Sequence, residues 1–335
     1  MIYRVVHVTE YGYTDPVATS HHLLHLAPRD TERQVCRCDE LTVAPAPASH
    51  AERLDHFGNR TTYFEMQEPH RHLTVESRRD VELLPLPAPP SSGGPAWETV
   101  RDRVRQPTDT ALLEACEMTY ASPFIRISDD VVAYARPSFA PRRPLLDVVA
   151  DLTHRIYEDL TYDQAATSVS TPVDEVLRLR RGVCQDFTHL EIACLRAMGL
   201  PARYVSGYLV TLPVPGKPRL VGADASHAWL AVYCPGIGWV PTDPTNDVVP
   251  DQRHITVAWG RDFGDVTPMR GVIVGGSRHD LRVSVDVSPV GERERVDQPA
   301  DDNQPARGAI NERGGGDGTT TGGSGTSAKA DRQSE

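Results

Sequence analysis

Alternating apolar and polar positions dominate the first 84 residues of the chain. Residues 2–9 alternate with a period of two, which is typical of a β-strand with one buried face. Proline, aspartate and glycine turn signals separate further alternating stretches, at residues 21–26, 34–43, 59–65 and 73–82. We therefore expect an N-terminal antiparallel, sandwich-like β domain with its own core over residues 1–84.

The pattern changes after a linker rich in proline, glycine and serine at residues 85–95. Apolar residues recur at three- and four-residue spacing along residues 145–157, which predicts a helix with Pro144 in its first turn. A second helix is expected over residues 184–198. It is apolar on nearly every side, so we expect it to be buried in the middle of a core domain over residues 96–290.

Alternation returns within this core domain, so its expected fold class is α+β. Strands are expected at residues 202–210, 227–234 and 239–243, with 271–274 and 281–287 closing the domain. From residue 291 the apolar periodicity stops and glycine-rich low-complexity sequence follows. We expect residues 291–335 to be a disordered tail.

The start of the buried helix is the clearest candidate for a catalytic site. Cys184 lies at this position, directly after a polar turn that contains glycine. A helix N-terminus lowers the pKa of a thiol and presents free backbone N–H groups. A cysteine nucleophile also needs an imidazole and a group that orients it. His227 and Asp243, at opposite ends of a predicted hairpin, are the candidates.

The register of that hairpin decides whether His227 and Asp243 can meet. A five-residue turn, residues 234–238, sets Tyr233 against Trp239 and puts the two candidates on one face. An even-length turn would separate them. Pro241 cannot donate to a ladder, so an edge position or a bulge could alter the count.

Simpler interpretations stand beside the catalytic one. Cysteine is among the most buried residue types, and Cys184 taken alone would be interpreted as a structural thiol. His189 on the same helix either hydrogen-bonds within the core or supports the site. Asp186 suits the positive end of the helix dipole, and it could also position a substrate. Cys36 and Cys38 lack the second ligand pair of a zinc site, so no metal is expected.

Ordered motifs in this region resemble the core of the transglutaminase-like superfamily. They are GVCQDFTH at residues 182–189, GLPARYVSGY at 199–208, ASHAW at 225–229 and GWVPTDPTN at 238–246. The N-terminal part, with DHFGN at residues 55–59, is similar to the β domain that precedes this core in bacterial members.

The resemblance implies a papain-like core in which Cys184 is the nucleophile, His227 the base and acid, and Asp243 the orienting group. Its chemistry would be acyl transfer from an amide through a thioester, to water or to an amine, with a protein or peptide as substrate. The backbone N–H of Cys184 would be one oxyanion donor. A second donor is not identifiable, with Tyr162 and Gln164 as weak candidates.

Composition narrows the function further. The net charge of −11 argues against binding nucleic acid or an anionic membrane. No apolar run approaches a membrane span and no signal peptide is visible, so we expect a cytoplasmic location, where a working thiol stays reduced. No cofactor motif is present. The oligomeric state is open.

Two other functions compete with the cysteine enzyme. One is a transglutaminase-like domain without turnover that serves as a binding or scaffold module. The other is an arylamine acetyltransferase, which uses the same kind of catalytic triad. That enzyme would need a basic cluster to bind coenzyme A, and the sequence lacks one.

Overall fold

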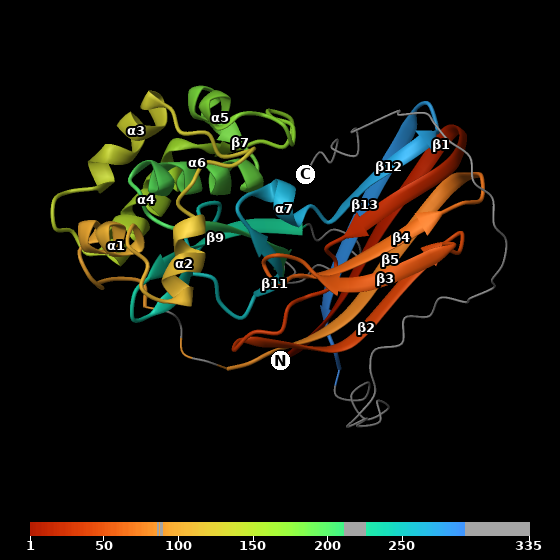
Figure 1. Ribbon diagram of the computed structural model, residues 1–335, viewed down its shortest axis with the longest axis horizontal. Helices are drawn as coiled ribbons and strands as arrows, with labels where there is room; N and C mark the ends of the chain where they lie inside the picture. Colours follow the sequence, from red (N-terminus) through yellow and green to blue (C-terminus); the bar gives the residue numbers. More distant parts are fainter. Residues whose placement is uncertain (86, 88–89, 211–225, 292–335) are drawn as a thin grey trace, which may run out of the picture. The chain divides into compact units, whose positions relative to one another are not determined.

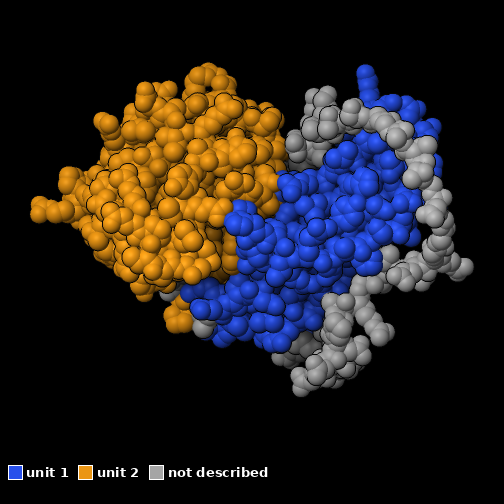
Figure 2. Space-filling view, viewed as in Figure 1, with its two compact units in different colours: residues 1–85, 208–225, 267–333 blue, residues 86–207, 226–266, 334–335 orange. Residues whose placement is uncertain are grey.

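The computed structural model describes residues 1–85, 87, 90–210 and 226–291 (Figure 1). The chain forms two compact units, coloured separately in Figure 2. The first comprises residues 1–85, 208–225 and 267–333, and the second residues 86–207, 226–266 and 334–335. The disordered tail expected from residue 291 lies outside the described residues except for residue 291 itself.

The first unit is built around one long strand, β1 (Ile2–Leu24), which alternates between buried and exposed positions. Its partners change where the register shifts between Gly12 and Val17, because different strands flank its two halves. All pairs that involve β1 are antiparallel. The other strands of this seven-stranded sheet are β2 (Gln34–Ala44), β3 (Ser49–Leu54), β4 (Arg60–Met66), β5 (His70–Leu83), β12 (Met269–Gly275) and β13 (His279–Pro289).

The last two strands occupy a different place from the one expected. The sequence predicts strands near residues 271–274 and 281–287, and the structure has them as β12 and β13. The sequence pattern places them in the core domain, whereas both pair with β1 in the first unit. Alternation shows that a strand has a buried face, but it does not show which sheet the strand joins.

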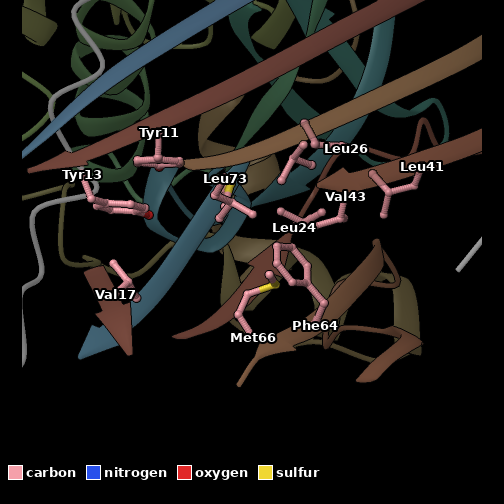
Figure 3. Packing of buried hydrophobic residues seen from close by; sticks show 12 residues of the cluster. Tyr11, Tyr13, Val17, Leu24, Leu26, Leu41, Val43, Phe64, Met66 and Leu73 are labelled. Atoms are coloured by element: carbon pink, nitrogen blue, oxygen red, sulfur yellow. The ribbon is translucent and has the colours of Figure 1, made fainter. Parts of the chain in front are cut away.

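Apolar side chains from β1, β2, β4, β5 and β12 form the core of the first unit (Figure 3). Phe64 and Met66 lie against this cluster with almost no exposed surface. Tyr11 and Tyr13 stack with ring centroids 5.9 Å apart. The two halves of β1 therefore contribute to one core, which agrees with the N-terminal antiparallel β domain expected from the sequence.

The second unit combines helices with a small sheet. Its helices are α1 (Trp97–Val104), α2 (Thr110–Glu117), α3 (Asp129–Ala135), α4 (Leu145–Asp159), α5 (Val173–Leu179), α6 (Cys184–Ala197) and α7 (Phe263–Val266), with a short 3₁₀ turn at Arg136–Ser138. A four-stranded sheet has the order β10 (Gly238–Thr242), β9 (Ser226–Cys234), β8 (Ala202–Leu209) and β11 (His254–Gly260). Two short strands, β6 (Thr161–Tyr162) and β7 (Arg181–Gly182), pair in parallel.

Helix α6 is the centre of this unit, as its all-round apolar sequence predicts. It contacts β9 as well as α3, α4 and α5, which surround it in Figure 1. Every residue from Gln185 to Arg196 is buried. The helix ends before Gly199, whose φ of 77° favours glycine. No helix within the described part of the chain is long and apolar enough to cross a membrane.

We predict that Phe64→Ala lowers the free energy of unfolding by about 3–5 kcal/mol, because it leaves a cavity in a packed core. The measurement is a urea titration followed by circular dichroism. Leu54→Ala is the control, since Leu54 is 66% exposed and its truncation should change stability by less than about 0.5 kcal/mol. Equal effects of the two changes would contradict this view of the core.

Candidate active site

The backbone before Cys184 is fixed by a side chain of the helix that Cys184 opens. Asp186 Oδ2 accepts a hydrogen bond from the backbone N–H of Val183 at 2.9 Å and another from Thr167 Oγ1 at 2.6 Å. A Cβ added to Gly182 would lie 2.5 Å from the same oxygen, so this close approach requires glycine. Burial raises the pKa of Asp186, and the two hydrogen bonds oppose that rise. Asp186 therefore holds the turn that leads to the cysteine.

His227 and Asp243 meet at one end of the four-stranded sheet. His227 is the second residue of β9, and Asp243 directly follows β10. Trp239 pairs with Tyr233, which confirms the register expected from a five-residue turn. His227 Nε2 and Asp243 Oδ2 are 2.8 Å apart, and the exposed fractions of the two residues are only 9% and 0%.

The Asp243 carboxylate accepts several hydrogen bonds at once. Oδ1 receives the backbone N–H of Thr245 at 3.0 Å, and Oδ2 receives Asn246 Nδ2 at 2.7 Å and His254 Nε2 at 3.2 Å. Burial alone would raise the pKa of Asp243. The hydrogen bonds from His227, His254 and Asn246 instead hold it well below its usual range, so the group is a carboxylate at neutral pH.

The charge of His227 depends on both of its neighbours. Burial would lower its pKa, but the hydrogen bond to Asp243, together with a hydrogen bond to Cys184 and the charges of both groups, raises it to about 10. Cys184 and His227 are thus neighbours, although they lie on a helix and on a strand. The ring of Trp229 lies beside the imidazole of His227, with the ring centroids 6.0 Å apart. At neutral pH this arrangement favours an imidazolium between a thiol group and a carboxylate.

A second buried carboxyl lies two helical turns beyond Cys184. Glu191 Oε1 accepts from Thr153 Oγ1 at 2.8 Å, and the Thr153 hydroxyl also lies 2.8 Å from Thr242 Oγ1. Glu191 Oε2 is buried without a hydrogen-bond partner among the described residues. Burial raises the pKa of Glu191 to about 8, and the charge of Asp243 adds to the rise. Glu191 is therefore mostly protonated at neutral pH.

The contacts of His189 fit a hydrogen-bonding role within the core, which is one of the two roles expected for it. Its Nε2 accepts the backbone N–H of Phe263 at 3.2 Å, and its ring packs beside Phe124 and Tyr204. Burial lowers its pKa to about 3, so the ring is neutral. His189 thereby ties α6 to the start of α7.

Tyr162, one of the two weak candidates for a second oxyanion donor, pairs with Gly182 across β6 and β7. Its strand therefore runs beside the turn that leads to Cys184. About half of the tyrosine side chain is exposed. Its role as a donor stays a prediction.

Two residues around Asp243 were missed by the sequence reasoning. Asn246 lies three residues after Asp243 in the same turn, and its nearness could have been inferred from the side-chain to backbone bonds that aspartate makes in turns. His254 lies 11 residues after Asp243, at the start of β11. No local pattern marks it, because only the path of the chain across the sheet brings it to the carboxylate.

Three residues of this site are the candidate metal ligands within the described part of the chain. Atoms of His227, Asp243 and His254 lie within 4.8 Å of one another. Two imidazoles and a carboxylate can bind Zn²⁺. Cys36, considered with Cys38 from the sequence, instead donates its thiol to the Cys38 carbonyl at 3.3 Å.

Comparisons with known proteins match both parts of the chain. Residues 3–82 match the family model for the bacterial transglutaminase-like N-terminal region, and residues 132–244 match the model for the transglutaminase-like superfamily. An uncharacterized protein of Mycobacterium tuberculosis is 48% identical over 295 residues, which cover 86% of this chain and 92% of that protein. A protein-glutamine gamma-glutamyltransferase of Pseudomonas aeruginosa is 34% identical over 93 residues, or 28% of this chain and 14% of that enzyme.

A solved structure shares the fold. It is a candidate cysteine protease from Cytophaga hutchinsonii, with a TM-score of 0.67 at 21% identity, and the match covers 86% of this chain and 90% of that one. The papain-like α+β fold with an N-terminal sheet domain, expected from the sequence, is therefore confirmed.

We predict that Glu191→Gln reduces the loss of stability between pH 5 and pH 8. A carboxyl whose pKa is higher in the folded state stabilises the fold fully below its unfolded pKa of 4.5, and this contribution is lost as the pH rises through about 8. The wild type should lose on the order of 1 kcal/mol per pH unit in this window, which glutamine removes. Thermal unfolding at both pH values measures the difference.

The control for this prediction is Glu114→Gln on α2, because Glu114 is exposed. It should keep the pH dependence of the wild type. A Glu191→Gln protein with an unchanged pH dependence would show that Glu191 is not protonated in the folded state.

Proposed function

Because the chain belongs to the transglutaminase-like superfamily, with the N-terminal region of its bacterial members, we propose that it transfers acyl groups from amides through a thioester on Cys184. His227 is the proton carrier and Asp243 orients it. The observation that carries the proposal is the His227 imidazole, which contacts Asp243 at 2.8 Å and also hydrogen-bonds Cys184 at the start of a buried helix.

In the first half of the reaction, the Cys184 thiolate attacks the carbonyl carbon of the amide. The negative charge that develops on the carbonyl oxygen is stabilised by the backbone N–H of Cys184, which lies in the first turn of α6 where N–H groups lack helical partners. The C–N bond then breaks. The leaving nitrogen takes the proton from His227, and a thioester remains on Cys184.

In the second half, an acceptor attacks the thioester carbonyl while His227 removes its proton. The C–S bond breaks and the thiolate and imidazolium are restored. Water as acceptor gives a carboxylic acid, as in a protease or amidase. A primary amine gives a new amide, as in a transglutaminase. Asp243 keeps the imidazole in place in both halves, because it holds Nε2 while the ring exchanges a proton on the side of Cys184.

We predict that iodoacetamide alkylates Cys184 readily at pH 6 and that His227→Gln slows this reaction by about 100-fold. A cysteine with an ordinary pKa of about 8.5 is less than ~1% thiolate at pH 6, whereas an imidazolium partner favours the thiolate. Mass spectrometry of the Cys184 peptide over time gives the rate.

The control for the alkylation experiment is His154→Gln, which changes an exposed histidine on α4 that is paired with Asp247. It should leave the rate unchanged. Cys194, which is fully buried and has a raised pKa, serves as an unreactive internal standard. Equal rates in the wild type and in His227→Gln would rule out the ion pair and hence the proposed nucleophile.

We predict that a peptide library containing glutamine, incubated with the protein, distinguishes the two acceptors. Ammonia release that needs an added primary amine indicates transamidation, and ammonia release in water alone indicates hydrolysis of the glutamine side-chain amide. New peptide amino termini, found by mass spectrometry, indicate hydrolysis of peptide bonds. Cys184→Ala should abolish either activity because no thioester can form. If Cys184 is alkylated rapidly but no amide in the library turns over, a binding or scaffold role becomes the better explanation.

We also propose a reducing compartment such as the cytoplasm. All six cysteines, including Cys184, are free thiols in the structure, and the reaction needs Cys184 reduced. Cell fractionation followed by thiol labelling tests this location. Recovery of the protein from an oxidising compartment would contradict it.

A further inference from the structure

The carboxylate of Asp243 is held by a second histidine, which the reaction described above does not use. His254 Nε2 lies 3.2 Å from Asp243 Oδ2, the same oxygen that His227 contacts at 2.8 Å. His254 is 6% exposed and Asp243 is fully buried. Two imidazoles therefore meet at one carboxylate oxygen, with their ring centroids 6.0 Å apart.

The path of the chain explains how the second histidine reaches the site. Strands β10 and β11 are the two edges of the four-stranded sheet. Asp243 follows β10 and His254 opens β11, so residues 243–253 connect one edge of the sheet to the other. The connection begins with a bridge in which Asp243 and Val248 exchange backbone hydrogen bonds of 2.9 and 3.3 Å. This bridge fixes the backbone of Asp243.

The backbone also decides which nitrogen of His254 carries the proton. The N–H of Asp251 points to His254 Nδ1 at 3.3 Å. A backbone N–H can only donate, so Nδ1 is the acceptor and the proton of the neutral ring lies on Nε2. The Nε2–H group then donates to Asp243 Oδ2. Trp229 packs edge-on against the ring at 5.2 Å and keeps its plane in this orientation.

We propose that His254 is a positioning residue, whose Nε2–H fixes the Asp243 carboxylate in the rotamer that accepts the hydrogen bond from His227. The role deepens the proposed function and rests on it, because His254 acts on Cys184 only through Asp243 and His227. A carboxylate turns easily about its terminal bond. Donors on both oxygens remove that freedom, with Thr245 on Oδ1 and both Asn246 and His254 on Oδ2.

A metal site made of His227, Asp243 and His254 is the competing interpretation. The Asp251 N–H argues against it, because a proton on His254 Nε2 blocks the lone pair that a metal would need. Among the described residues, the other titratable or charged groups that act on this carboxylate or on His254 are Arg253, Asp251 and Glu191 of α6. Asp251 Oδ1 lies 3.5 Å from His254 Nδ1.

The test compares His254→Phe, which keeps a ring against Trp229 but removes the donor, with His254→Gln, whose amide can donate to Asp243. We predict that His254→Phe slows alkylation of Cys184 at pH 6 by about 10- to 100-fold, as expected for loss of a hydrogen bond to a buried charge. The acid limb of its pH–rate profile should move to higher pH, because a displaced Asp243 carboxylate no longer holds the His227 imidazolium beside Cys184. His254→Gln should restore most of the rate and the profile.

Proton NMR adds a readout that a merely structural role would not move. The proton between His227 Nε2 and Asp243 should give a downfield signal that shifts in His254→Phe and returns in His254→Gln. Circular dichroism checks folding. If His254→Phe does not fold, His254→Asn replaces it, because its shorter amide can accept from Asp251 but cannot reach Asp243.

Each outcome decides a different question. If His254→Phe keeps the wild-type rate and pH profile while His227→Gln is slow, the positioning role is wrong and the proposed function stands. If His227→Gln also alkylates like the wild type, the proposed function itself fails. A metal site would replace the positioning role if the wild type binds one equivalent of Zn²⁺ and His254→Gln does not. In that case EDTA should remove the metal and make alkylation of Cys184 faster.

Discussion

The hydrogen bond between Asp243 Oδ2 and His227 Nε2 joins two buried groups, each of which would tend to lose its charge without the other. Burial alone would favour a neutral carboxyl and a neutral imidazole. Instead, hydrogen bonds hold Asp243 as a carboxylate, and that charge raises the pKa of His227. The chemistry proposed for Cys184 depends on this pair, because an imidazolium stabilises a neighbouring thiolate and a neutral imidazole does not.

Two carboxyls close to the buried helix have opposite pKa shifts for a simple reason. Asp243 receives hydrogen bonds from three side chains and a backbone N–H. Glu191 receives one from Thr153, and its Oε2 has no partner within the part of the chain that the structure describes. The donors decide which group keeps its charge at neutral pH. A neutral Glu191 thereby avoids repulsion between its own charge and that of Asp243. Helix α6 is therefore more than a support for Cys184, because it also carries a neutral acid behind the site.

The turn before Cys184 and the connection after Asp243 are fixed in the same way, by hydrogen bonds from the backbone to an aspartate side chain. In both, the carboxyl group of an aspartate accepts a backbone N–H and thereby fixes the local chain. Asp186 does so from the first turn of α6, and Asp243 does so after β10. Gly182 allows the first close approach. The second is completed from a distance by His254, which arrives with the opposite edge strand. Hydrogen bonds therefore hold the backbone before Cys184 and the side chain of Asp243 in place.

Local patterns were enough to predict the elements on which the site is built. The all-round apolar stretch predicted a buried α6, and the odd-length turn predicted the pairing of Tyr233 with Trp239, because burial and register leave periodic traces in the sequence. The partners of β12 and β13 and the approach of His254 to Asp243 were decided only by the tertiary structure. The reason is physical: a period shows which face of a segment is buried, but contacts between residues far apart in the chain depend on how whole strands are ordered in a sheet.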